Sequence, residues 1–124
     1  MRSPLDRHIE QSFDPSFDLS EAEQREFMFD YVAVDPQFFR SGYVMERILR
    51  RIKRLDLTSS EKGAIRALLM SRIQGPGRRN FRDICKLVPL VQNDGLAAKI
   101  ADLVTSPDTA VSARAKMAQT YFAR

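Results

Sequence analysis

The sequence predicts an all-α protein, a compact stack of about six or seven antiparallel helices that forms a helical bundle or a short array of helical hairpins. Apolar residues recur along most of the chain at the three- and four-residue spacing of a helix face. Capping residues stand where these helices would begin, and no segment alternates between apolar and polar residues as a strand does. With 124 residues, 44% hydrophobic and 29% charged, the chain suits one soluble domain.

Residues 1–18 are expected to form a flexible acidic N-terminal tail, and residues 19–124 a single helical domain. The tail holds Pro4, Pro15, four acidic residues and scattered apolar residues without a sustained period. The folded part is expected to start just before Ser20.

The first helix is expected to begin at Ser20 and to run to about Ala33, because Ser20 and Glu23 form a capping box. Asp35 and Pro36 are typical of a second helix start, with the aspartate as cap and the proline in the first turn.

Residues 43–55 are expected to form the next helix, after a break at residues 41–42. Thr58 and Glu61 make a second capping box, which predicts a helix that ends near Ile73. The apolar residues of both segments recur at helical spacing, so each helix is expected to bury one face.

A Gly-Pro-Gly sequence at residues 75–77 is the clearest break in the chain. After it, Asn80 is expected to cap a helix that Pro89 kinks, Asn93 the next helix, and Asp108 the last. The predicted core consists of Phe27, Tyr31, Ile48, Leu49, Ile52, Ile65, Leu68, Leu69, Ile84, Val88, Ile100, Leu103, Val111, Ala118 and Phe122.

Residues 100–118 combine a leucine-bearing helix, a Pro-Asp turn, and then Val111 and Ala115 at helical spacing. This stretch resembles a single HEAT-type helical hairpin and covers about a sixth of the chain, with no second copy at a fixed period. The resemblance implies stacked antiparallel hairpins and a binding function, because proteins of that kind are mostly scaffolds.

Charge is sorted along the chain. Residues 1–40 carry four basic and nine acidic side chains, residues 41–82 carry eleven and three, and residues 83–124 carry five and four. The basic middle third is dense in arginine. Such a concentration creates a local positive potential that attracts anionic partners.

One helix face in the basic third is the sharpest candidate site. Its members stand at positions i, i+4, i+7 and i+11, which places them on one stripe opposite the apolar face. Such a stripe can follow a phosphate backbone or an acidic protein groove, and its tyrosine can stack on a base or anchor a protein contact. The alternative is an ordinary solvated face with a Glu46–Arg50 pair. The stripe consists of Tyr43, Arg47, Arg50 and Arg54.

The turn after residues 75–77 is the second candidate, because Arg78 and Arg79 precede a helix start. Arginines there stand at the positive end of the helix dipole, a placement that becomes favourable when an anion binds. The alternative is a surface loop with exposed arginines. The full set of predicted partner-binding residues is Tyr43, Arg47, Arg50, Arg51, Arg54, Arg78, Arg79 and Arg82.

Arg72 projects into the apolar face formed by Leu68 and Leu69. We expect its side chain to extend past that face to solvent, or to cap the final carbonyls of its own helix. The alternatives are a buried ion pair and a face that opens onto a partner.

The residues give catalysis little support. The single histidine, His8, lies in the predicted tail, and the single cysteine, Cys85, sits on an apolar helix face and is expected to be buried and inert. No residue spacing suggests a metal site, and the glycines near residue 75 lack the lysine and the spacing of a phosphate-binding loop. We therefore expect no enzyme activity, no catalytic residue, no metal and no cofactor.

No stretch approaches the roughly 20 consecutive apolar residues of a membrane span, and the N-terminus lacks the apolar run of a secretory signal. We expect a cytoplasmic protein without membrane contact, and export by a dedicated secretion machine stays open. The sequence makes no prediction of the oligomeric state.

The leading functional hypothesis is a non-enzymatic binding protein, an adaptor, regulator or inhibitor that presents an arginine-rich helical face to an acidic protein partner. The alternative is a nucleic-acid-binding protein that uses the same face on the phosphate backbone of DNA or RNA. Against the alternative, the chain has no recognisable nucleic-acid-binding motif, and its acidic first forty residues would repel phosphate.

Overall fold

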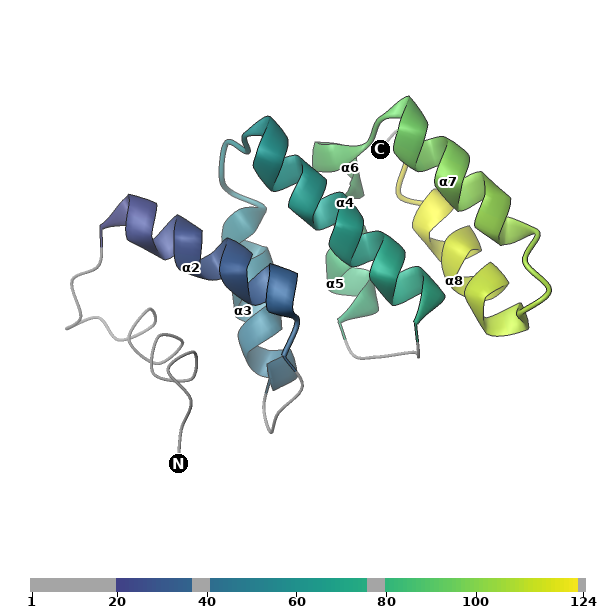
Figure 1. The fold of residues 1–124 in the computed structure, drawn as a ribbon, viewed down its shortest axis with the longest axis horizontal. Coiled ribbons are helices and arrows are strands. Elements are labelled where there is room, and N and C mark those ends of the chain that lie inside the picture. Colours follow the sequence, from purple (N-terminus) through teal and green to yellow (C-terminus); the bar gives the residue numbers. More distant parts are fainter. Residues whose placement is uncertain (1–19, 37–40, 76–79, 123–124) are drawn as a thin grey trace.

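The computed structural model describes residues 20–36, 41–75 and 80–122. Within these ranges it has seven helices and no strand, which confirms the predicted all-α fold (Figure 1). The predicted tail, residues 1–18, lies outside the described residues. The helices are α2 (Glu21–Val34), α3 (Ser41–Ile52), α4 (Ser59–Gln74), α5 (Phe81–Cys85), α6 (Val88–Val91), α7 (Asp94–Val104) and α8 (Thr109–Gln119).

Helix α4 is the centre of the stack and contacts α2, α5, α6 and α8. Helix α3 packs against α2 and α5, and α7 and α8 form a hairpin at the other end of the molecule (Figure 1). The surface between α3 and α5, on which the functional argument depends, is therefore built by segments that are distant in sequence.

Four of the predicted helix starts are confirmed. The Oγ of Ser20 accepts a hydrogen bond from the N–H of Glu23 at 3.1 Å, and both halves of the Thr58–Glu61 capping box are present in the same way. Asn93 caps α7, and Asp108 accepts from two backbone N–H groups of α8. Each of these side chains satisfies N–H groups that have no partner inside the helix.

One predicted start is wrong, and another lacks the capping hydrogen bond that we expected. Asp35 ends α2 in the left-handed conformation, with φ 47°, and the next described helix begins at Ser41, so residues 41–42 belong to α3 and do not break it. Helix α5 begins directly after Asn80, as predicted, but Asn80 lies at φ 75° and its side chain makes no capping hydrogen bond. Its side-chain N–H donates to the carbonyl of Gly42 at 3.1 Å. Aspartate and asparagine tolerate positive φ better than other residues with side chains, so they suit turns as well as caps.

The segment around Pro89 forms two short helices in place of the single kinked helix that we predicted. Helix α5 ends at Cys85 and α6 begins at Val88, with Pro89 in its first turn. Proline has no N–H and cannot donate to the carbonyl four residues earlier, which is that of Cys85. The break therefore falls before the proline and redirects α6 against α4.

The predicted core is confirmed except for Leu103 and Phe122, which are half-buried and pack against its edge. Cys85 is fully buried, as expected. Further buried residues, which fill the space between the helices, are Met28, Val32, Met45, Ile73, Leu87, Val91, Leu96 and Ala115.

The carboxylate of Glu61 ties the start of α4 to α2. It accepts a hydrogen bond from the N–H of Thr58 at 2.9 Å, and its Oε1 and Oε2 lie 2.5 and 3.1 Å from Nη2 and Nε of Arg25. Arg25 also donates to the carbonyl of Asp56 at 2.8 Å. The hydrogen bond from Arg25 lowers the pKa of Glu61 below its ordinary value and outweighs the opposing effect of burial.

We expect Glu61→Gln to lower the free energy of unfolding at pH 7, and the difference from wild type to disappear in acid. Because the pKa of Glu61 is lower in the folded state, its charge stabilises the protein above the unfolded-state pKa, and this contribution is lost as pH falls through the folded-state pKa. Glutamine at this position can still complete the capping box, so the substitution leaves the cap and removes the charge and one of the two oxygens that accept from Arg25. Urea unfolding of both proteins from pH 7 to about pH 3 measures the effect. A difference that persists unchanged at the lowest pH would contradict it.

Candidate binding surface between α3 and α5

Several arginines bind the protein's own backbone and side chains, so they are committed to the fold. Arg66 of α4 donates to the carbonyl of Val91 at 2.7 Å, at the end of α6. Arg51 of α3 is half-buried, and its Nη2 lies 2.5 Å from Oε1 of Gln24. Arg51 was predicted to bind a partner, but in this structure its guanidinium holds α3 to α2.

We expected Arg72 to extend to solvent or to cap its own helix. In the structure it makes a buried ion pair instead, which was one of the alternatives. Its Nε and Nη2 donate to Oδ2 and Oδ1 of Asp35 at 2.8 and 2.7 Å, and its side chain is 6% exposed. The final carbonyls of α4 are capped by another residue, Arg114 of α8, which donates to Ile73 and Gly75 at 2.9 and 2.5 Å. A guanidinium suits both tasks, because its planar fork can donate to two acceptors at once.

The remaining cations near α3 are exposed. Arg47 and Arg50 lie on the outer face of the helix, and Tyr43, which is 59% exposed, lies one turn before Arg47. Arg54 is exposed but does not continue the helical stripe, because α3 ends at Ile52 and the N–H of Arg54 bonds to the carbonyl of Arg51 in a turn. Lys53, which we had not predicted, is exposed in the same turn.

Helix α5 and the residue that follows it carry two exposed cations. Arg82 and Lys86 stand four residues apart, and α5 packs against α3. Arg82 is thus the one predicted residue outside the 43–54 stretch that the structure describes. The predicted residues Arg78 and Arg79 lie outside the described residues.

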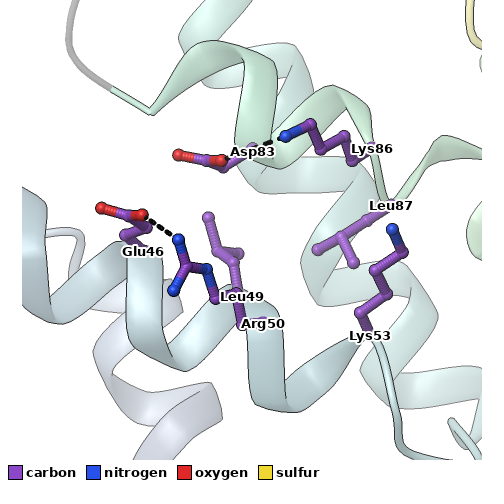
Figure 2. Close-up of a pocket in the computed structure, with 7 residues that line it drawn as sticks. All are labelled: Glu46, Leu49, Arg50, Lys53, Asp83, Lys86 and Leu87. Atoms are coloured by element: carbon purple, nitrogen blue, oxygen red, sulfur yellow. Dashed lines mark hydrogen bonds and ion pairs between the residues drawn. The ribbon is translucent and has the colours of Figure 1, made fainter.

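A groove of about 200 Å³ separates the two basic segments. Figure 2 shows Glu46, Arg50 and Lys53 on its α3 side and Asp83 and Lys86 on its α5 side, with apolar side chains between them. The groove is lined by Glu46, Leu49, Arg50, Lys53, Asp83, Lys86 and Leu87.

Two ion pairs line the groove, and both are weak. Arg50 and Glu46 form an exposed i,i+4 pair at 2.5 Å, and pairs of this kind contribute about 0.3–0.5 kcal/mol. The ammonium of Lys86 stands 3.8 Å from a carboxylate oxygen of Asp83, near the outer limit for an ion pair. Within the described parts of the chain, Lys53 has no carboxylate within ion-pair distance. An incoming anion can therefore engage these cations at little cost.

The described residues offer few groups for covalent or metal chemistry. Burial raises the pKa of the Cys85 thiol to about 12, so the nucleophilic thiolate is scarce at neutral pH. In the ranges that the structure covers, no three histidine, cysteine or carboxylate side chains are placed to hold a metal ion. The same ranges contain no helix that is both long and apolar enough to cross a bilayer. His8 lies outside them.

Helices α7 and α8 form a hairpin at the position of the HEAT-type resemblance, with Ser106, Pro107 and Asp108 in its turn. Membership of that family stays a prediction. The chain matches no protein-family model, no curated protein and no solved structure in the three comparisons. The functional proposal accordingly depends on the geometry of the α3–α5 surface.

Proposed function

We propose that the protein is a non-enzymatic binding protein, an adaptor, regulator or inhibitor, that presents a basic surface to an acidic protein partner. One observation supports this most. Exposed cations from two separate segments line both sides of one groove, Arg50 and Lys53 on one side and Lys86 on the other. The basic surface consists of Arg47, Arg50, Lys53, Arg54, Arg82 and Lys86, with Tyr43 at its edge.

The charges within the surface favour a protein over a nucleic acid. Glu46 and Asp83 lie among the cations, and they would repel a phosphate backbone that crosses the groove. A folded partner can place a carboxylate against each cation and a donor against each carboxylate, which is the electrostatic complementarity that gives protein interfaces their specificity. The exposed ring of Tyr43 suits such an interface, because tyrosine is enriched at energetically dominant contacts.

We expect the triple reversal Arg47→Glu, Arg50→Glu and Arg54→Glu to reduce affinity for the partner at least about 10-fold, mainly through slower association. The protein should remain folded, because exposed substitutions usually change stability by no more than about 0.5 kcal/mol each. Affinity purification from the producing cells identifies the partner, and surface plasmon resonance with the purified pair then gives the rate constants.

The matched control is Lys62→Glu, Lys99→Glu and Lys116→Glu, which changes net charge by the same amount on α4, α7 and α8. It should leave the affinity within a few-fold of wild type. Reversal of acidic residues on a protein partner should restore binding to the triple variant.

Nucleic acid is the alternative partner, and salt dependence distinguishes it. Binding to DNA or RNA through the backbone predicts a log–log slope of about −0.7 to −0.9 per phosphate contact, with a loss in the triple variant that is uniform across sequences. Full-strength binding of every partner by the triple variant would show that the basic surface is only solvated.

A further inference from the structure

We infer that the groove between α3 and α5 binds one carboxylate side chain of the partner. The partner segment that carries this carboxylate also carries an apolar side chain next to it. This inference rests on the proposed function and specifies the chemistry that the groove recognises.

The charges that line the groove leave room for one anion. Its walls carry three cations, Arg50, Lys53 and Lys86, and two carboxylates, Glu46 and Asp83. One incoming carboxylate neutralises the single excess positive charge of the groove. A phosphate monoester, with a charge of about −1.5 to −2 at pH 7, would leave the groove with a net negative charge. Each strand of duplex DNA adds a phosphate for about every 3.4 Å of helix axis, and these further charges would be repelled by Glu46 and Asp83.

The floor of the groove is apolar. Leu49 and Leu87 are 2% and 1% exposed, and what remains accessible of them lies between the charged walls (Figure 2). The two leucines expose little surface themselves, so the apolar contact available to a glutamate or to an apolar side chain next to it comes mainly from the methylene stems of Arg50, Lys53 and Lys86. The groove holds about 200 Å³, less than the roughly 300–1,000 Å³ typical of small-molecule sites, so a side chain of a larger partner suits it better than a metabolite.

Lys53 is the cation best placed to anchor the carboxylate. It belongs to the turn after α3 and has no acidic partner among the described residues, so binding requires no ion pair to open there. Arg50 and Lys86 lie at the edges of the groove in weak, exposed pairs with Glu46 and Asp83 (Figure 2). They can therefore turn toward a carboxylate on Lys53 at little cost and strengthen its binding.

The experiment is a nuclear magnetic resonance titration of the full chain with capped peptides. One peptide alternates glutamate and leucine over about six residues, a second replaces each glutamate by glutamine, and a third probe is oligothymidylate of the same net charge. We expect saturable shifts of the amides of Leu49, Lys53 and Leu87 with the first peptide, and binding at least about 10-fold weaker with the second, because glutamine lacks the charge.

The decisive variant is Lys53→Gln, with Lys62→Gln on α4 as its matched control. Lys53→Gln should weaken the glutamate–leucine peptide at least about 10-fold, and Lys62→Gln should leave it unchanged. Lys53 is exposed, so the spectrum of the variant should otherwise match that of the wild type.

Three results would overturn the inference: no groove resonance shifts with the acidic peptide, Lys53→Gln binds it as wild type does, or oligothymidylate occupies the groove more tightly than the peptide. These results are independent of the proposed function. If the triple arginine reversal abolishes binding of the native partner while Lys53→Gln leaves the affinity for the peptide unchanged, the proposed function is supported and the groove inference is wrong. If the peptide saturates the groove through Lys53 while the triple variant keeps its partner, the groove does bind a carboxylate, but the proposed function is wrong.

Discussion

Replacement of Asp35 by asparagine is expected to lower the free energy of unfolding by about 3 kcal/mol, because it removes the carboxylate to which the buried guanidinium of Arg72 donates two hydrogen bonds. The Arg72 side chain is only 6% exposed, and both carboxylate oxygens of Asp35 accept from it. Loss of one partner of a buried pair costs about 3–5 kcal/mol, and the 15% exposure of Asp35 lets water reduce the cost. Asparagine also tolerates the positive φ of this position, so the substitution adds no backbone strain and removes only the charge and one of the two acceptor oxygens.

The double variant Asp35→Asn and Arg72→Met is the control for this prediction. It removes both charges and fills the space of the arginine stem with an apolar side chain, so most of the lost stability should return. Arg72→Met alone should cost less than Asp35→Asn, because the carboxylate that remains is nearer to water. Urea denaturation of the four proteins gives the interaction energy as a double-mutant cycle. A loss below about 0.5 kcal/mol for Asp35→Asn would mean that the pair does not hold α2 to α4.

The helix starts could be predicted from the sequence because their causes are local. A capping box needs a side chain and an N–H group three residues apart, and the Ser20–Glu23 and Thr58–Glu61 boxes form where the sequence places them. Pro89 shows the limit of such reasoning. The proline indicated a disturbed helix, but whether the chain bends or breaks there depends on how α6 packs against α4.

The roles of the arginines could not be predicted, because their acceptors are distant in sequence. Arg72 and Asp35 are 37 residues apart, and Arg114 lies 41 residues from Ile73, whose carbonyl it caps. The sequence showed that Arg72 interrupts an apolar face, which was a usable signal of a buried pair. It gave no means of choosing between Asp35 and solvent.

The sequence predicted the basic surface except for Lys53 and Lys86. Arg47 and Arg50 follow from helical spacing, but the position of Lys53 depends on where α3 ends, and that of Lys86 on the packing of α5 against α3. Lys86 stands four residues after Arg82, a spacing that is typical of one helix face and is a local signal for this pair of cations. Neither the helical spacing in α3 nor the spacing of Arg82 and Lys86 predicts the groove, because only the packing of α5 against α3 brings the two segments together.

Truncation of Leu49 or Leu68 to alanine is expected to lower the free energy of unfolding by about 2–5 kcal/mol, the cost of deleting buried methyl groups and leaving a cavity. Leu68 is 5% exposed on the central helix α4, which contacts four other helices. Leu49 is 2% exposed and also forms part of the groove floor, so its truncation should weaken the glutamate–leucine peptide as well.

Leu90→Ala is the matched control, because Leu90 carries the same side chain on α6 but is 38% exposed. It should cost clearly less than either core truncation, since less apolar surface returns to water and no closed cavity forms. Urea denaturation measures all three variants. Losses below about 0.5 kcal/mol at both Leu49 and Leu68 would mean that their helices bury the opposite faces. The cations of α3 would then point inward, and neither the basic surface nor the groove could exist as described. The stability of these two variants therefore tests the orientation of α3 on which both functional proposals depend.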